Sequence, residues 1–517
     1  MNERIPMETH FSIWDNGVVI LYLAAMVFMG TRFRKKSSTP EGFMIAQGKL
    51  PSWAVGLSIL GAFVSSMTFI AYPGFAYNTN WDAFMFSVTL PFAALIATLY
   101  FIPLYRTRVK VSAFEYMEQR FGGWARVYSS VSFMFGETTR VGMILFLLSL
   151  PLHNITGWSY PSIIIVSGIT VVFYTMMGGI EAVVWTDVVQ VIILFGGALA
   201  TIIYIFVGMP EGPAQVFTIA AENNKFSLGN WDFDLVQPTA WVVVLYGIME
   251  NLRNFGVDQN NVQRYQTTRT IKDASRSLWT AALGYIPISA IFLFIGTALF
   301  AFYAVHPDQL PAALKESDMG DKIFPYFIAT QLPAGVRGLV IAAIFAAAQS
   351  TVSSSLNCLS ALTYYDFYKR YFNPHADDKL SMKLLRSYTV IWGIIGTITG
   401  LALIRIRVAL EAGWQFGGIA GGGVIGLFLL GIAFPHVKRW PAVCAVIASV
   451  LSIAWATFAR DLPTSLKWLE CNWHTRMIGV IGTITLLVVG VALSFLSTLM
   501  SRARSGSSGC PPGALSG

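Results

Sequence analysis

The chain has 517 residues, of which 55% are hydrophobic and 12% carry a charged side chain. A soluble domain usually has about 25% charged residues, so this composition excludes an ordinary water-soluble protein. The formal net charge is +8. This charge does not indicate a nucleic-acid partner, because no recognition motif accompanies the basic residues and orientation in a membrane accounts for them.

Apolar segments long enough for a membrane-spanning helix, which needs about 20 residues, recur along the chain. They are too continuous for the alternating pattern of a membrane barrel. The first segment follows a start, MNERIPMETHFSIW, that lacks the features of a secretory signal, so we expect it to be retained. The pattern predicts an all-α integral membrane protein with about 13 spans. They are expected at 13–33, 52–76, 82–104, 124–152, 159–177, 184–208, 239–257, 277–304, 335–366, 385–405, 410–433, 440–459 and 475–499.

Lysine and arginine clusters follow the first, third, seventh, ninth and eleventh expected spans, which places all of them on one side. The positive-inside rule makes that side cytoplasmic. We therefore expect a multi-pass plasma-membrane protein (inner membrane in a bacterium), with its N-terminus outside and its C-terminus in the cytoplasm. The clusters comprise Arg32, Arg34, Lys35, Lys36, Arg106, Arg108, Lys110, Arg264, Arg269, Lys272, Arg276, Lys369, Arg370, Lys438 and Arg439.

Two expected spans contain residues that interrupt a membrane helix. The second, LSILGAFVSSMTFIAYPG, has Gly61, Pro73 and Gly74 among several hydroxyl residues. The seventh, VLYGIMENLRNFG, has Gly247 and Glu250 where lipid-facing residues are expected. A broken membrane helix persists only where protein or water takes up the freed backbone groups, so breaks indicate a cavity. Two interrupted spans, five spans apart, indicate an inverted-repeat transporter.

This organisation divides the chain into five parts. They are an N-terminal extra helix and cytoplasmic loop (1–51), a first inverted repeat (52–208), a second inverted repeat with its extracellular loops (209–433), C-terminal extra helices (434–500) and a flexible Gly-, Ser- and Pro-rich tail (501–517).

The stretch AAAQSTVSSSLN places five hydroxyl side chains between positions 350 and 355, inside a membrane span. A hard cation stripped of water needs several oxygen ligands at close range, and hydroxyls with freed carbonyls suit a monovalent ion. The alternative is that these hydroxyls bond back to the preceding helical turn or allow close packing. On a helix, one polar face comprises Ala347, Ser350, Thr351 and Ser354, with Ser353 beside them, whereas Ser355 points away and is expected only to pack.

Two charged residues also fall within expected spans. Asp187 begins the sixth span, where an ionisable side chain is a functional candidate by default; the alternative is an interfacial carboxylate facing the cytoplasm. Arg140 lies well inside the fourth span, in FMFGETTRVGMILFL. Its guanidinium either pairs with Glu137 one turn earlier or clamps a substrate carboxylate. Both alternatives stay open at this point.

Four motifs resemble the sodium/solute symporter family: MTF at Met67, GGIEAVVWTDVVQ at 178–190, DQNNVQR at 258–264 and IAAIFAAAQSTVSSSLN at 341–357. That family includes sodium/glucose cotransporters and bacterial sodium/sialic acid symporters, and this chain is most similar to the latter, from Val19 to about Ser497. The resemblance implies a five-helix inverted-repeat core with extra helices at both ends.

The resemblance also implies one or two bound Na+ ions. The first site would use backbone carbonyls of Gly61, Val64 and Ala347 with the hydroxyls of Ser350 and Thr351. The second, present in some members, would use Ser350, Ser353, Ser354 and Asp187.

For the substrate, the resemblance implies a site at Phe63, Ser65, Thr68, Ala83, Ser87 and Arg140. The sialic acid branch has a hydroxyl at Phe63, an aromatic at Ala83 and a glutamine at Ser87, so three contacts are changed here. Gln259 in the DQNNVQR box would either contribute to a sugar site or cap the seventh span on its cytoplasmic side.

We therefore expect a sodium-coupled secondary active symporter for an acidic sugar such as sialic acid, with a neutral sugar as the alternative and a transporter-like solute sensor as a remote one. A channel would need a filter-like repeat, and an enzyme a nucleophile, base and orienting group; neither pattern occurs. The expected partners are a small-molecule substrate and the lipid bilayer. A monomer suffices for this function, and the oligomeric state stays open.

Overall fold

The computed structural model describes residues 11–315, 319–404, 423–460 and 464–507. Within these ranges the protein consists of helices, short helical turns and connecting loops. The extended pairing there is limited to one isolated bridge between Leu50 and Thr268. The expected all-α architecture is therefore confirmed for the described part of the chain.

Among the described residues, nine helices are long and apolar enough to cross a membrane, and ten if a bent pair counts as one span. The bent pair is α3 (Ser52–Phe63) and α4 (Ser66–Asn78). The nine are α1 (Ile13–Phe33), the run from α5 (Phe84–Val88) through α6 (Leu90–Ile96) and η2 (Ala97–Phe101) to α7 (Ile102–Arg108), α9 (Gly123–Thr156), α10 (Tyr160–Val207), α14 (Ile271–Val305), α16 (Val336–Leu362) with η5 (Thr363–Phe372), α17 (Asp378–Leu403), α19 (Arg439–Phe458) and α20 (Ile478–Ser507).

Three further segments account for the difference from 13 expected spans. The helix α10 has 48 residues, or about 72 Å at 1.5 Å per residue, enough for two crossings. It is interrupted at Gly179, between two expected spans. The helix α12 (Ala240–Gly256) and the apolar helix Gly423–Ala433 are shorter than the other spans. The expected span at 410–433 begins outside the described residues.

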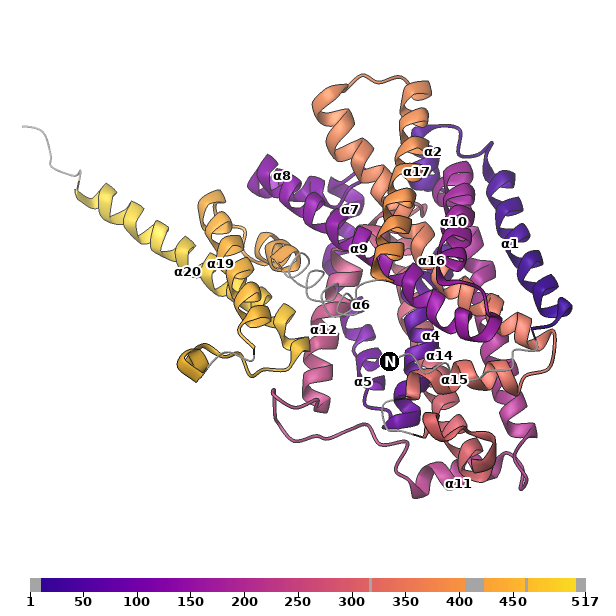
Figure 1. Cartoon of the computed structure of the whole chain (residues 1–517). Coiled ribbons are helices and arrows are strands. Elements are labelled where there is room, and N and C mark those ends of the chain that lie inside the picture. Colours follow the sequence, from indigo (N-terminus) through magenta and orange to yellow (C-terminus); the bar gives the residue numbers. More distant parts are fainter. Residues whose placement is uncertain (1–10, 316–318, 405–422, 461–463, 508–517) are drawn as a thin grey trace, which may run out of the picture.

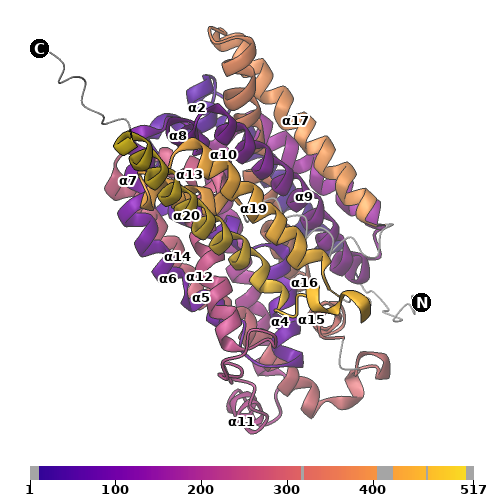
Figure 2. The ribbon, with the colours of Figure 1, turned by 90° about the vertical axis from the view of Figure 1, so that its left-hand side faces the viewer.

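Shorter helices connect the spans. They are α2 (Pro40–Ile45), α8 (Phe114–Phe121), α11 (Ala214–Glu222), α13 (Gln259–Gln266) and α15 (Gly320–Thr330). Figures 1 and 2 place α2, α8 and the start of α17 at one end of the bundle and α11 at the other. The first of these ends carries the cationic clusters at 32–36, 106–110 and 369–370, and we call it the basic end.

Side-chain caps set where several helices begin. The Ser12 hydroxyl accepts a hydrogen bond from the Trp14 amide before α1. The Asp377 carboxylate accepts one from the Leu380 amide before α17. Such caps satisfy amide groups that have no partner within the helix. They fix the register of these two long helices.

The helix α16 lies in the middle of the bundle, with α1 on one side and α19 and α20 on the other (Figure 1). In its membrane-spanning window 94% of the residues are buried, compared with 28% for α1. The long α10 packs against both α16 and α1. The five hydroxyl residues of α16 therefore face protein rather than lipid.

The predicted break in the second span is confirmed, and that in the seventh is wrong. The bent pair turns by 57°, and Val64 between the two helices has an extended backbone, with φ −84° and ψ 103°. By contrast, α12 runs unbroken to Gly256. Its polar residues are satisfied along the helix, because Arg253 Nε donates to Glu250 Oε2 at 2.9 Å. The division into repeats at 52–208 and 209–433 stays a prediction.

Candidate functional site

The end of α3 meets the hydroxyl face of α16. The Ser350 hydroxyl donates to the Gly61 carbonyl at 2.9 Å, and the Thr351 hydroxyl to the Ala62 carbonyl at 3.3 Å. These carbonyls lie in the last turn of α3, where the helix break leaves them without the usual amide donors. The structure thus brings together residues almost 290 positions apart. Val64 is buried at the same turn.

The spacing of these oxygens suits a small cation. The Ser350 hydroxyl lies 3.2 Å from the Ala347 carbonyl, and the Thr351 hydroxyl lies 3.4 Å from it. Six oxygens at about 2.4 Å from a cation, as in calcium sites, lie about 3.4 Å from their neighbours. All the groups in this set are neutral, so they fit a monovalent ion better than a divalent one.

The alternative role of these hydroxyls is also visible. Ser353 and Ser354 donate to the Ser350 carbonyl at 3.1 and 2.7 Å, within the same helix. Ser355 donates to the Thr351 carbonyl at 3.0 Å. Ser355 was expected only to pack, but its hydroxyl also lies 3.2 Å from Glu137 Oε2. Ser350 and Thr351 differ from these three because their second acceptor is on α3.

Asp187 lies on α10, fully buried beside this face. Its Oδ2 accepts hydrogen bonds from the Ser58 hydroxyl at 2.6 Å and from Arg264 Nη2 at 3.0 Å. Its Oδ1 is buried and has no hydrogen-bond partner in the described part of the chain. The interfacial position considered for this carboxylate is therefore wrong. This oxygen is therefore available to accept a hydrogen bond or to coordinate a cation.

Arg264 was missed as a site residue, because its sequence position placed it among the cations that orient the chain. It is fully buried on α13. Its guanidinium also donates to the Ser354 hydroxyl, and its Nε donates to the Ser58 hydroxyl at 2.7 Å. The sequence signal that could have identified Arg264 as a site residue was its position in the DQNNVQR motif. The guanidinium joins the two ends of the expected second sodium set, Asp187 and Ser354.

The rest of α13 is buried among neighbouring elements. Gln259 accepts from the Ala113 amide at 2.7 Å and donates to the Val111 carbonyl at 2.8 Å. Its side-chain amide is therefore satisfied by the loop before α8. Gln263 donates to Asn357 Oδ1 on α16 at 2.8 Å. The Gln259 side chain therefore bonds to the loop before α8 and not to the end of α12, and its role in sugar binding stays a prediction.

Arg140 on α9 forms the pair with Glu137 that was one of its two expected roles. Its Nη1 lies 3.0 Å from Glu137 Oε1 and 3.9 Å from Asp258 Oδ2. Its Nη2 lies 3.5 Å from the Ala62 carbonyl, at the break in α3. The Arg140 side chain keeps 37% of its surface exposed, so it remains accessible to a ligand.

Comparisons with known proteins agree with this geometry. The profile described as "Sodium:solute symporter family" matches residues 43–438. The chain belongs to the sodium:solute symporter family. It is 34% identical to the sodium/sialic acid symporter SiaT of Proteus mirabilis, over 94% of this chain and 95% of that one. It is 32% identical to the sodium/sialic acid symporter NanT of Aliivibrio fischeri, over 91% and 90%.

A solved structure supports the same placement of the chain. It is described as a substrate-bound outward-open state of a Na+-coupled sialic acid symporter. The TM-score is 0.86, with 32% identity over 94% of this chain and 98% of that one. A more distant relative is the sodium-coupled monocarboxylate transporter 2 of Homo sapiens, 28% identical over 89% of this chain and 75% of the relative. This symporter is thus a multi-pass membrane transporter rather than an enzyme, with Na+ as its coupling ion.

The expected solute residues of this symporter gather partly around the α3 break. The Phe63 ring packs against Phe255 and Tyr285, with ring centroids 5.6 and 5.1 Å apart. Ser65 is the residue before α4, and Thr68 is buried in its first turns. Two aromatic rings therefore pack against Phe63, the position at which the sialic acid branch has a hydroxyl.

The other two expected solute residues lie at either end of the short helix α5. Ala83 is the residue before this helix, and Ser87 is fully buried within it. The Ser87 hydroxyl has no hydrogen-bond partner in the described ranges. The structure brings Phe63 and Arg140 to the same break in α3, and the place of Ala83 and Ser87 in a common solute site stays a prediction.

Proposed function

We propose that this symporter takes up a sugar acid of the sialic acid class together with sodium. The observation that carries the proposal is Arg140, whose guanidinium is accessible and lies 3.5 Å from the Ala62 carbonyl at the break in α3. A guanidinium can bind a carboxylate through two parallel hydrogen bonds. The names of the two sialic acid symporters above support this substrate class.

The first sodium ion would lie between the end of α3 and α16. Its ligands would be the carbonyls of Gly61, Val64 and Ala347 and the hydroxyls of Ser350 and Thr351. Sodium there would hold the broken helix against α16 and so order the neighbouring solute residues. Coupling of this kind is worth about 1–3 kcal/mol and is reciprocal, so the solute should also tighten sodium binding.

The second sodium ion would use Ser350, Ser353, Ser354 and Asp187. In the arrangement described, Arg264 Nη2 already lies 3.0 Å from the Asp187 carboxylate and compensates its charge. We therefore propose that the second ion binds only when this guanidinium moves away. One sodium ion then accompanies the conformation described, and the stoichiometry depends on Arg264.

The basic end would be the cytoplasmic side, following the positive-inside rule, with the N-terminus outside and the C-terminus inside. Buried polar contacts close this end. Asp366 on η5 accepts hydrogen bonds from Arg126 Nε at 3.1 Å and from the hydroxyls of Ser112 and Ser130 at 2.8 and 2.6 Å. These contacts join α9 and the loop before α8 to the end of the α16 run. Solute and sodium would then enter from the opposite end.

A neutral sugar is the second candidate substrate. Glu137 already neutralises Arg140 at 3.0 Å, so charge balance does not require a carboxylate on the solute. The aromatic cluster at Phe63 would suit the apolar face of a sugar ring. A neutral substrate would leave each sodium ion uncompensated, so transport would move charge inward.

The experiment that separates the candidates is a thermal-shift measurement on the purified protein. Sialic acid, glucose and buffer would be compared in sodium chloride and in potassium chloride, because a ligand that binds the native state raises its melting temperature. We expect sialic acid to stabilise the protein in sodium and much less in potassium. Stabilisation by glucose but not by sialic acid would overturn the acidic-sugar proposal.

A further inference from the structure

A basic pocket opens where the end of α1, the middle of α10 and the first turns of α17 meet. Its cavity volume is about 980 Å³. Asp378 is the single acidic residue that lines it. The lining contains five cationic side chains: Arg34, Lys35, Lys379, Lys383 and Arg386. No lining residue belongs to the proposed sodium or solute sites.

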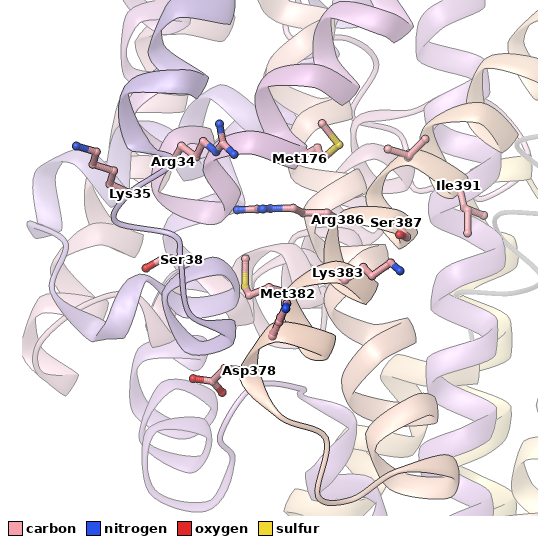
Figure 3. A pocket seen from close by; sticks show the side chains of 12 residues that line it. Arg34, Lys35, Ser38, Met176, Asp378, Met382, Lys383, Arg386, Ser387 and Ile391 are labelled. Carbon is pink, nitrogen blue, oxygen red and sulfur yellow. The ribbon is translucent and has the colours of Figure 1, made fainter.

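The cations of this pocket form no ion pairs with other described residues. Within the described ranges none of the five forms an ion pair, whereas the neighbouring Lys36 pairs with Glu181 at 3.0 Å. Figure 3 shows Arg34 and Arg386 extending toward each other from different helices. The Arg386 Nε is buried without a hydrogen-bond partner there. A buried guanidinium nitrogen that faces a like charge is costly unless an anion accepts its hydrogen bonds.

The other side of the pocket is apolar and faces outward. Met176 and Met382 lie beside the two arginines (Figure 3), and Val390 and Ile391 continue the lining along α17. Ile391 keeps 46% of its surface exposed. It lies eight residues after Lys383, or about 12 Å further along the helix axis. The pocket therefore has a cationic part at the basic end and an apolar part that extends toward the membrane.

We propose that this pocket binds an anionic phospholipid, with its phosphate groups on Arg34, Lys383 and Arg386 and an acyl chain along Val390 and Ile391. Arginine forks match phosphate oxygens in pairs, and basic pockets between membrane helices suit lipid headgroups. The excess of cations over the one carboxylate favours a headgroup with two phosphates. A soluble anion would use the cations but leave the apolar lining uncovered, so a lipid fits better.

The test is a thermal-shift assay on the full chain in detergent, with cardiolipin as the two-phosphate lipid. Phosphatidylcholine and inorganic phosphate, at matched phosphorus concentration, are the comparisons. We expect cardiolipin to raise the melting temperature by several degrees and the other two to raise it by much less. An equal effect of inorganic phosphate would indicate a free-anion site, and an equal effect of phosphatidylcholine a general lipid effect; either result overturns the proposal.

A pair of double variants locates the binding. Lys383→Gln with Arg386→Gln removes two cations from the pocket and should lose at least half of the cardiolipin shift. The control, Lys110→Gln with Lys438→Gln, removes the same charge from exposed positions at the basic end that do not line the pocket. It should keep the full shift. Equal shifts in both double variants would overturn the proposal, and Lys383→Gln alone serves if the first pair does not fold.

Discussion

The hydroxyl of Ser350 is the atom on which the proposed sodium site depends most, because it reaches both α3 and its own helix. We expect Ser350→Ala to raise the sodium concentration for half-maximal uptake about tenfold, which corresponds to about 1.4 kcal/mol of lost binding. The measurement is uptake into proteoliposomes as a function of sodium concentration at fixed solute.

Ser355→Ala is the matched control for this variant. It removes a hydroxyl from the same helix, but one that bonds to Thr351 and Glu137 rather than to α3. It should leave the sodium dependence close to that of the parent protein. If Ser350→Ala shows the parental sodium dependence, the first sodium site lies elsewhere.

Arg264 gives a different prediction, because it compensates a buried carboxylate. Removing one partner of a buried ion pair costs about 3–5 kcal/mol, so Arg264→Gln should lower the melting temperature by several degrees. The uncompensated charge of the buried Asp187 carboxylate should then attract sodium. We expect added sodium, and not potassium, to stabilise Arg264→Gln more than the parent protein in a thermal-shift assay.

The variant that combines Arg264→Gln with Asp187→Asn separates the two effects. Without the carboxylate, the extra stabilisation by sodium should disappear. Equal stabilisation of the single variant and the parent by sodium would show that Asp187 is not an ion ligand.

Arg140 decides between the two candidate substrates. Arg140→Gln should reduce sialic acid uptake by at least tenfold, because it removes the paired donors for a carboxylate, and should change the uptake of a neutral sugar little. Competition between labelled sialic acid and unlabelled sugars measures both. If the variant takes up sialic acid at the same rate as the parent, Arg140 serves only to neutralise the charge of Glu137.

At the scale of the elements, the break in α10 depends on one glycine. Gly179 has φ 57° and ψ −155°, a backbone conformation that residues with a Cβ atom rarely adopt. An added Cβ would also lie 2.8 Å from the Phe43 carbonyl oxygen. We expect Gly179→Ala to destabilise the protein by about 1–3 kcal/mol, measured as a lower melting temperature.

Gly196→Ala in the same helix is the control. An added Cβ there meets nothing within 4 Å, and alanine favours a helix by about 1 kcal/mol over glycine. This variant should be neutral or slightly more stable. Equal melting temperatures for the two variants would mean that the break tolerates a side chain and is not set by Gly179.

The sequence predicted the helices that are long and apolar enough to span a membrane. It also predicted the break near Gly61, where small and hydroxyl residues are concentrated. It was misleading in α12, because the polar residues that suggested a break pair with each other one turn apart, as Glu250 and Arg253 do. Sequence spacing alone does not distinguish a polar residue that needs a cavity from one that is satisfied along its own helix.

A contact within the site was predictable only where both residues that form it lie in a recognisable sequence pattern. The hydroxyl stripe and the helix break marked the two segments, and the family resemblance implied that Ser350 and Gly61 face each other. The position of Arg264 did not, because a basic residue between two spans is normally accounted for by membrane orientation. Its buried position results from the whole of α13 folding into the bundle, where its partners come from α3, α10 and α16.

At the scale of the whole molecule, the proposed closure of the basic end by the contacts around Asp366 implies that these contacts break in each transport cycle. Asp366→Asn removes the negative charge of the group that accepts the three hydrogen bonds described above and so weakens them. We expect this variant to shift the conformational equilibrium toward a state in which the basic end is open. Cys358 on α16 is fully buried in the closed arrangement. In a protein with the other three cysteines changed to serine, it becomes a single reporter of water entry.

Labelling of Cys358 by a water-soluble maleimide should therefore be several times faster in Asp366→Asn than in the parent, and sodium should slow it in both. Sodium acts in this direction because a ligand favours the conformation that it binds more tightly, here the one in which α3 is held against α16. Glu41→Gln, which changes an exposed carboxylate on α2 at the same end, should leave the rate unchanged. An unchanged rate in Asp366→Asn would mean that α13, rather than the Asp366 contacts, keeps the basic end closed.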